Sequence, residues 1–384
     1  MRIAILSSLI YHQVKEHHGY DRVVWGGAER YMLELCNHIK SLGHTVELFQ
    51  QINPEGADVN NIRNVGLIYK DFCGFKVTCF PSIDYTNAYG TFPNLNATFN
   101  EYAENHDLRI YFVTNLCYPQ VKLPAVSISH GVFWDYPTAV QNTSYTDEQK
   151  RIFFERQMYG FTAPSVCVAV DYNVKNVVRA IAPGKETRTL VIPNFVDTNH
   201  FKPNTTRPIP CEPDGKDCTV LFPRRFVSVR GSNEFLYSSI KNPHIHHLAV
   251  GQPNSMAKQA SMGAHKSIEW THCEPKDMLE FYDRADMMVV PTKSSEGLSL
   301  SLLEGMACGI PIITTMNGGL STGIIPGYNA ITYDQDFVSL HEVIKDLAQE
   351  KDLRAKLRKN AVETAKEFDI EGWKYNWTHV LNGF

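Results

Sequence analysis

The amino-acid sequence predicts an α/β protein with two doubly wound, parallel-sheet domains. Short apolar runs that end at polar loops alternate with segments of helical periodicity, which is the pattern of βαβ units. This alternation stops in a stretch with several prolines at residues 196–217 and then starts again. The length of 384 residues suits roughly two to three domains of ordinary size.

The first domain is predicted at residues 1–193. It opens with a strand, RIAILSS, and continues with a helix over 26–44 whose apolar residues share one face. Gly43 suits the end of this helix, because glycine readily takes the left-handed backbone conformation found there. Further strands are expected where apolar runs end at polar residues, at 45–50, 107–115, 123–130, 165–171 and 187–194.

Residues 194–217 are predicted to be a hinge and linker, and the second domain follows at 218–366. Its helices include one near Asn233, one from Pro275 and a long charged helix over 342–368. Residues 367–384 form a tail that contains Trp373 and Trp377. The strands of this domain are expected at 218–223, 245–251, 266–271, 286–291 and 310–315.

Composition and charge exclude several classes of protein. The formal net charge of −4 argues against binding to bulk nucleic acid. No opening signal peptide is recognised, and no apolar run of about 18 residues suggests a transmembrane helix. The nine cysteines are scattered and often lie in apolar runs, which predicts free thiols in a reducing compartment. A cytoplasmic location is therefore expected.

The stretch SSEGLSLSLLEGMACGIPIITT, residues 294–315, combines two acids with a run that otherwise resembles core. Its order is loop, helix and strand, with Ser299 as the predicted N-cap and Gly309 after the helix end. Glu296 then falls in the loop at the carboxyl end of a strand, and Glu304 interrupts the apolar face of the helix. Ligands of parallel sheets bind at this edge, so the pattern predicts a nucleotide site with two carboxylates that bind hydroxyl groups.

Several stretches together resemble the retaining glycosyltransferases of family 4. The first is Glu296, seven residues, Glu304 and then GMACGIPII; the others stand in the family's order along the chain. The resemblance covers most of the chain and is strongest over 219–316. The supporting stretches are GGAER, VIPNFVDTNHF, PRRFVSVRG and FYDRADMMVVPTKSSEG.

Membership in this family implies the GT-B fold, in which two Rossmann-like domains face each other across a cleft, with the first on the acceptor side. It implies transfer of a hexose-type sugar from a nucleotide-sugar donor to a glycan, lipid-linked or small-molecule acceptor, with retained anomeric configuration. It also implies no cofactor and no obligatory metal, a tail helix that crosses back to the first domain, and a possible peripheral contact with a membrane. Uridine, guanosine and adenosine donors all remain open.

Five positions depart from the pattern of the family. Phe195 replaces the glycine of the hinge segment, and Arg224 and Arg230 replace the glycine and lysine of the phosphate segment. The usual EGFG loop reads EGLS, with Leu298 and Ser299. Arginine can take the phosphate role because it stays charged and offers a bidentate fork.

The chemistry of sugar transfer suggests which groups bind the leaving diphosphate, because negative charge develops on it and needs fixed cations and backbone amides. Arg225 and Arg230 are the expected cations. Gly26 and Gly27, at the start of the first helix, are expected to approach the same group closely. The amides at the start of the two-glutamate helix complete the expected donor site: Gly297, Leu298, Ser299 and Leu300.

Three further residues are expected to contact the sugar and the ribose. Glu304 is assigned to the ribose hydroxyls and Glu296 to the hydroxyls of the donor sugar. His130 follows a predicted strand, and the resemblance places it beside the donor sugar. His12, His17 and His18 share one loop without an acid at metal-ligand spacing, so no metal site is expected there.

Three other functions compete with this interpretation. A nicotinamide-dependent oxidoreductase needs GxGxxG after the first strand, and LSSLIYHQ lacks it. A sugar-nucleotide epimerase on the same fold and a non-catalytic subunit that binds nucleotide sugars both remain open.

Overall fold

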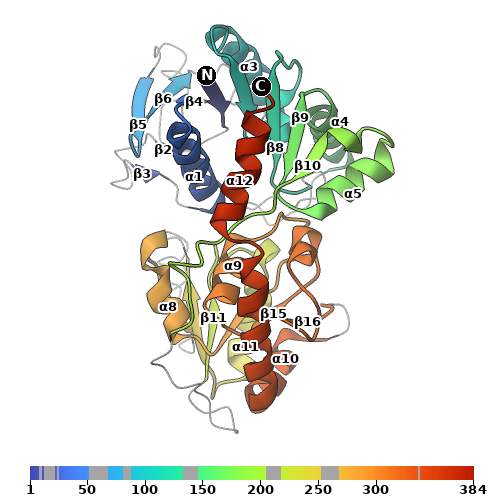
Figure 1. The fold of residues 1–384 in the computed structure, drawn as a ribbon. Helices are drawn as coiled ribbons and strands as arrows, with labels where there is room; N and C mark the ends of the chain where they lie inside the picture. Colours follow the sequence, from blue (N-terminus) through green and yellow to red (C-terminus); the bar gives the residue numbers. More distant parts are fainter. Residues whose placement is uncertain are drawn as a thin grey trace. The chain divides into compact units, whose positions relative to one another are not determined.

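The computed structural model of the chain describes residues 1–7, 11–12, 22–23, 26–51, 68–80, 88–132, 146–204, 218–251, 268–335 and 338–384. The described chain divides into two compact units (Figure 1). Of the described residues, unit 1 contains those up to Ile192 together with Lys374–Phe384, and unit 2 contains Pro193–Trp373. The predicted pair of α/β domains with parallel sheets is confirmed.

Unit 1 is built on a sheet of eight strands in the order β10-β9-β8-β7-β1-β4-β6-β5. All pairs are parallel except β5–β6, an antiparallel hairpin at the edge that the sequence analysis did not predict. The strands are β1 (Arg2–Leu6), β4 (Thr45–Gln51), β5 (Ile68–Phe72), β6 (Phe75–Phe80), β7 (Leu108–Tyr111), β8 (Ala125–Ser129), β9 (Val166–Ala169) and β10 (Thr189–Val191), with the separate pair β2 (Tyr11–His12) and β3 (Arg22–Val23).

The helices of unit 1 follow the strands as a doubly wound sheet requires. In α1 the buried face contains Tyr31, Met32 and Leu35, and Gly43 after its end has a φ of +80°, as predicted. The helices are α1 (Gly27–Ser41), α3 (Ala88–Tyr102), η1 (Thr114–Cys117), α4 (Asp147–Thr162), α5 (Tyr172–Ile181) and η2 (Glu186–Arg188), and unit 1 also contains the last turns of α12 (Ile370–Leu381).

Unit 2 has a parallel sheet of six strands in the order β13-β12-β11-β14-β15-β16. The strands are β11 (Thr219–Phe222), β12 (His246–Val250), β13 (Ile268–Thr271), β14 (Met287–Val290), β15 (Ile312–Thr314) and β16 (Ile331–Thr332). The helices are η3 (Ser228–Arg230), α6 (Ser232–Lys241), η4 (Pro275–Asp277), α8 (Met278–Arg284), α9 (Leu300–Ala307), η5 (Gly318–Thr322), α10 (Leu340–Gln349) and α11 (Lys351–Lys366).

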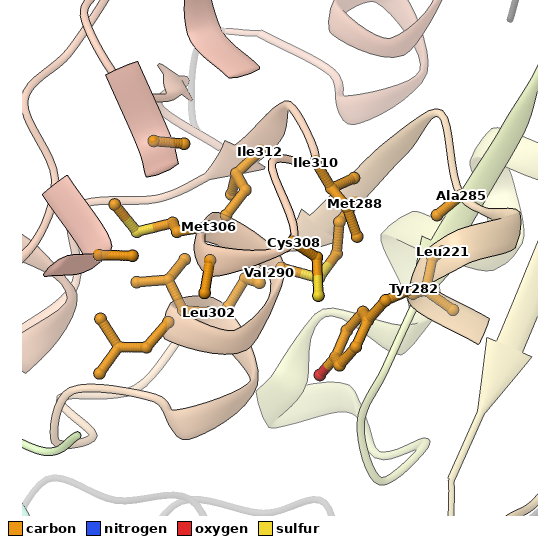
Figure 2. Packing of buried hydrophobic residues seen from close by; sticks show 14 of the residues in the cluster. Leu221, Tyr282, Ala285, Met288, Val290, Leu302, Met306, Cys308, Ile310 and Ile312 are labelled. Carbon is orange, nitrogen blue, oxygen red and sulfur yellow. The ribbon is translucent and has the colours of Figure 1, made fainter. Parts of the chain in front are cut away.

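Helix α9 is the two-glutamate helix of the sequence analysis, and its apolar residues anchor it to the sheet. Leu302 and Met306 are fully buried and pack with Val290 and Ile312 of the neighbouring strands (Figure 2). Ser299 is the N-cap residue, and Gly309 has a φ of +70°, both as predicted. This packing makes the start of α9 a fixed point at the carboxyl edge of the sheet.

The structure corrects two predictions in unit 2. The charged segment 342–368 is not one helix, because the chain breaks at Glu350 between α10 and α11. Cys218 is disulfide-bonded to a partner outside the described residues, so the prediction of free thiols is wrong for that residue. Seven others are free: Cys36, Cys73, Cys79, Cys117, Cys167, Cys273 and Cys308.

The start of the predicted hinge segment is tied to the end of unit 2. The backbone of Val196 accepts a hydrogen bond from Ile370 and donates one to Phe368. The rings of Phe195 and Trp373 lie 4.5 Å apart between centroids. Motion at this segment stays a prediction, and residues 205–217 of the predicted linker lie outside the described residues.

Candidate functional site

The loop that follows β14 holds Glu296 at the carboxyl edge of the sheet in unit 2. Gly318, with a φ of +57°, packs against it so closely that a Cβ there would lie 2.5 Å from the carbonyl oxygen of Glu296. Gly319 donates a backbone hydrogen bond of 2.7 Å to the same oxygen. The position of Glu296 therefore depends on glycine at 318.

Thr292 fixes the base of this loop. Its carbonyl oxygen accepts hydrogen bonds from the side chains of Thr315 at 2.7 Å, Asn317 at 2.7 Å and Gln335 at 3.1 Å. Its hydroxyl donates to the carboxylate of Glu296. A backbone carbonyl with three side-chain donors is held firmly, so Glu296 is attached to a rigid support.

Glu296 lies between two arginines, and the side chains of all three residues are mostly buried. Arg224 Nη2 donates to Glu296 Oε1 at 2.7 Å, and Arg230 Nη1 contacts Oε2. The side chains of Arg224, Arg230 and Glu296 are 8, 15 and 9% exposed. Two guanidiniums beside one carboxylate leave an excess positive charge, which suits a second anion.

The structure places Arg224, and not the expected Arg225, in this cluster. Arg225 is exposed, whereas Arg224 is held by both Glu296 and the hydroxyl of Thr292. Of two consecutive arginines in a loop, sequence spacing alone does not say which one turns inward. Arg230 is the other arginine that contacts Glu296, and a cation was expected at this position.

The loop before α9 and the first residue of this helix carry the amides that were expected to bind the diphosphate. Within the described part of the chain, no group accepts a hydrogen bond from the backbone N–H of Gly297, Leu298, Ser299 or Leu300. Such unpaired amides at a helix start attract anions. The carbonyl of Leu298 is held by the side chain of Asn194, which fixes the peptide that carries the Ser299 amide.

Glu304 lies deeper than the sequence analysis expected. It is 3% exposed, and Tyr282, itself 1% exposed, donates a hydrogen bond of 2.6 Å to its Oε2. Tyr282 thus holds Oε2 of Glu304, and the role of Glu304 toward a ribose stays a prediction. Figure 2 shows Tyr282 among the residues of the core cluster.

Gly26 and Gly27 stand at the start of α1 in unit 1, as predicted. The N–H of Gly26 is already used, because it donates a hydrogen bond of 2.8 Å to the carboxylate of Glu29. Among the described residues, a Cβ on Gly26 would approach that carboxylate, with Oε2 at 2.8 Å. Binding of an anion by this amide would therefore require Glu29 to move.

His130 follows β8 at the carboxyl edge of the sheet in unit 1. Its Nε2 is buried and has no hydrogen-bond partner in the described chain. Burial lowers the pKa of His130 to about 4, and a hydrogen bond to the backbone of Phe112 opposes this shift only in part. His130 is therefore a neutral imidazole at pH 7, and its Nε2 is left without a hydrogen-bond partner in the described chain.

Two kinds of feature are absent from the described residues. They contain no group of three or more His, Cys, Asp or Glu side chains that could hold a metal ion. Among them no helix has the length and apolar character needed to cross a lipid bilayer. The side chains of His12, His17 and His18 lie outside the described residues.

Comparison with protein families finds two matches that together span most of the chain. Residues 25–200 match the model described as Glycosyltransferase Family 4. Residues 211–364 match the model described as Glycosyl transferases group 1. The two matches meet near the division between unit 1 and unit 2.

Two curated relatives illustrate the similarity in sequence. An uncharacterized glycosyltransferase of Methanocaldococcus jannaschii is 35% identical over 96 residues, which is 25% of this chain and 27% of that protein. A D-inositol 3-phosphate glycosyltransferase of Acidothermus cellulolyticus is 28% identical over 218 residues, 51% of this chain and 46% of that protein. The chain thus matches about half or less of the length of these relatives.

Solved structures with the GT-B fold match over the whole chain. A sucrose-phosphate synthase from Thermosynechococcus elongatus gives a TM-score of 0.75 at 16% identity, covering 100% of this chain and 98% of that one. The Anabaena protein HepE, solved in complex with UDP and glucose, gives 0.69 at 14% identity and covers 100% of both chains.

Proposed function

The chain belongs to the family 4 glycosyltransferases with the GT-B fold, and on this premise we propose that it transfers a hexose-type sugar from a nucleoside diphosphate donor. The acceptor is a hydroxyl group of a glycan, a lipid-linked sugar or a small molecule. The anomeric configuration is retained, and no metal takes part.

The observation that carries this proposal is the cluster of Arg224, Arg230 and Glu296 beside the free amides of α9. The two guanidiniums carry one more positive charge than the single carboxylate neutralises. Their charge and the amides would bind the diphosphate and stabilise the charge that it gains as the glycosidic bond breaks. Leaving-group stabilisation by fixed cations also removes the need for a metal.

Two groups would contact the transferred sugar. Glu296 would accept hydrogen bonds from its hydroxyls while it holds the two arginines in place. His130 would contact another hydroxyl through its open Nε2. In this proposal no side chain attacks the sugar, and the leaving phosphate takes the proton of the acceptor.

A panel of nucleoside diphosphates tests the donor site directly. A ligand at 100 times its dissociation constant adds roughly 2.7 kcal/mol to the free energy of unfolding, so the cognate nucleotide should raise the melting temperature clearly. The shift and the subsequent sugar transfer should both survive a chelator. Absence of a shift with every nucleotide would argue against the proposal, and activity restored only by manganese would refute its metal-free part.

Substitution of Glu304 and of Glu296 should have different effects on binding and turnover. Glu304→Ala should weaken binding of the diphosphate and of the intact donor alike, by about 1.5–3 kcal/mol for hydrogen bonds to a charged group. Glu296→Gln should spare diphosphate binding and reduce turnover, because Glu296 is assigned to the sugar. Gln is chosen over Ala at 296 because Ala would remove the acceptor oxygens that both guanidiniums contact.

Calorimetric binding beside steady-state turnover distinguishes the two acids. Tyr282→Phe is the matched control for Glu304, since it removes the hydroxyl that donates to Oε2 and leaves the carboxylate. Equal weakening of diphosphate binding by Glu304→Ala and Glu296→Gln would show that the roles are divided wrongly.

Analysis of the products separates the remaining alternatives. A sugar-nucleotide epimerase would convert the donor without an acceptor, and a binding subunit would bind the donor without turnover. The intact cluster around Glu296 and the open nitrogen of His130 favour a transferase.

A further inference from the structure

Tyr31 of α1 lies between His130 and the tail helix α12. Trp377 Nε1 donates a buried hydrogen bond of 3.0 Å to the hydroxyl of Tyr31, across 346 positions of sequence. The ring of Tyr31 stands edge-on to that of His130, with centroids 5.2 Å apart at 87°. All three residues belong to unit 1, where Figure 1 shows α12 close to α1.

The orientation of the His130 ring depends on these neighbours. Its bond to the backbone of Phe112 uses Nδ1, since Nε2 has no partner in the described chain. One hydrogen bond fixes a single point of the ring and leaves its tilt free. The Phe112 ring at 4.7 Å and the Tyr31 ring at 5.2 Å are what set that tilt.

We propose that Tyr31 and Trp377 are positioning residues for His130, which hold its Nε2 in place to accept a hydrogen bond from a sugar hydroxyl. In a neutral imidazole whose Nδ1–H donates, Nε2 is an acceptor. This inference rests on the proposed function for the role of His130. It adds that α12, although distant in sequence, sets the geometry of the site.

The polar bond distinguishes this arrangement from simple filling of the core. Tyr31 is 1% exposed and Trp377 is fully buried, and two apolar side chains would fill the same volume without any need for polar partners. A satisfied polar bond in such a place restricts the orientation of both rings. The ring of Tyr31 is then fixed at both ends, by its own backbone in α1 and by Trp377.

The chain supplies a matched control for the loss of this bond. Thr378, next to Trp377, lies 2.9 Å from His38 Nε2 through its hydroxyl. This contact also joins α12 to α1, but it involves neither Tyr31 nor Trp377. Thr378→Val should therefore weaken the attachment of the helix without disturbing the imidazole.

Turnover and diphosphate binding are to be measured for Tyr31→Phe, Trp377→Phe and Thr378→Val in the full chain. The first two remove the same bond and should each lower kcat about 10- to 100-fold, as displacement of a catalytic group does, with unchanged diphosphate binding. The double variant Tyr31→Phe/Trp377→Phe should have a kcat little lower than that of either single variant. Thr378→Val should keep kcat within about twofold, since surface and packing changes away from the site act on stability.

The His130→Ala background provides the decisive comparison. There Tyr31→Phe should have no further effect on kcat, because the residue it positions is gone. Independent effects that multiply would overturn the proposal, as would an equal loss of kcat in Thr378→Val.

A measurement without substrate keeps this inference separate from the proposed function. The ¹⁵N shifts of the His130 imidazole report its tautomer and surroundings in the full-length protein. They should change in Tyr31→Phe and Trp377→Phe but not in Thr378→Val. Unchanged shifts in all three would refute the positioning role, whereas changed shifts in a protein that transfers no sugar would refute only the proposed function.

Discussion

Two histidines, one in each unit, have nearly the same pKa but differ in the hydrogen-bond partners of their rings. Burial lowers the pKa of both His130 and His247 to about 4. His247 of β12 has both ring nitrogens occupied, by Ser238 Oγ and the carbonyl of Ile245, each at 2.9 Å. His130 leaves Nε2 without a partner in the described chain.

The comparison shows that a shifted pKa does not by itself mark a functional residue. Desolvation depresses the pKa of any buried imidazole, whether or not it binds a ligand. The open nitrogen and its place at the carboxyl edge of the sheet separate His130 from His247. Three experiments test this distinction.

The largest expected effect is a loss of stability in acid, shared by both histidines. Between pH 6.5 and 4 the unfolded chain binds a proton at each histidine while the folded chain does not. The free energy of unfolding therefore rises with pH across this window. Each histidine contributes about 3 kcal/mol, which is fully present above pH 6.5 and is lost as the pH falls toward 4. Unfolding curves of the wild type, His130→Ala and His247→Ala at pH 7 and 4.5 measure it, and each substitution should flatten the pH dependence.

The second effect separates the two histidines. His130→Ala should lower kcat about 100-fold, because a misplaced substrate hydroxyl costs about that much, while diphosphate affinity is kept. His247→Ala should leave kcat unchanged at a temperature where the protein stays folded. Steady-state turnover of both variants gives the result. If the two variants had equal kcat, His130 would be a structural residue like His247.

The smallest effect comes from giving His247 the same open nitrogen. Ser238→Ala removes the partner of Nε2 and should cost about 1–3 kcal/mol of stability, since a buried polar group is left unsatisfied. Turnover should not change, because His247 lies near the amino end of its strand. Denaturant unfolding and a kcat measurement of this one variant decide the point. A change in kcat would mean that His247 reaches the site.

Much of the fold follows from the sequence because both units repeat one pattern. Apolar runs that end at polar residues identified most strands of the two sheets, including β14 and β15 on either side of α9. The antiparallel strand β5 was missed, since its segment carries charges and lacks a long apolar run. The break at Glu350 was missed because helical periodicity continues across it.

The site was only partly visible in the sequence. The spacing of Glu296 and Glu304 placed one acid in a loop and the other in a helix, as the structure has them. Which of Arg224 and Arg225 turns inward depends on the path of a loop, and the bond from Tyr282 to Glu304 depends on tertiary packing. Neither has a local signal, and the same holds for the disulfide at Cys218.

The bond between Trp377 and Tyr31 also has a consequence for biosynthesis. Ribosomes make unit 2 after most of unit 1 and before residues 374–384. Domains usually fold as they are completed during translation. Here unit 1 receives Trp377 only once all of unit 2 has been translated. A translation product that stops at residue 373 contains His130 but lacks its support, so synthesis of the first unit alone does not produce a finished site.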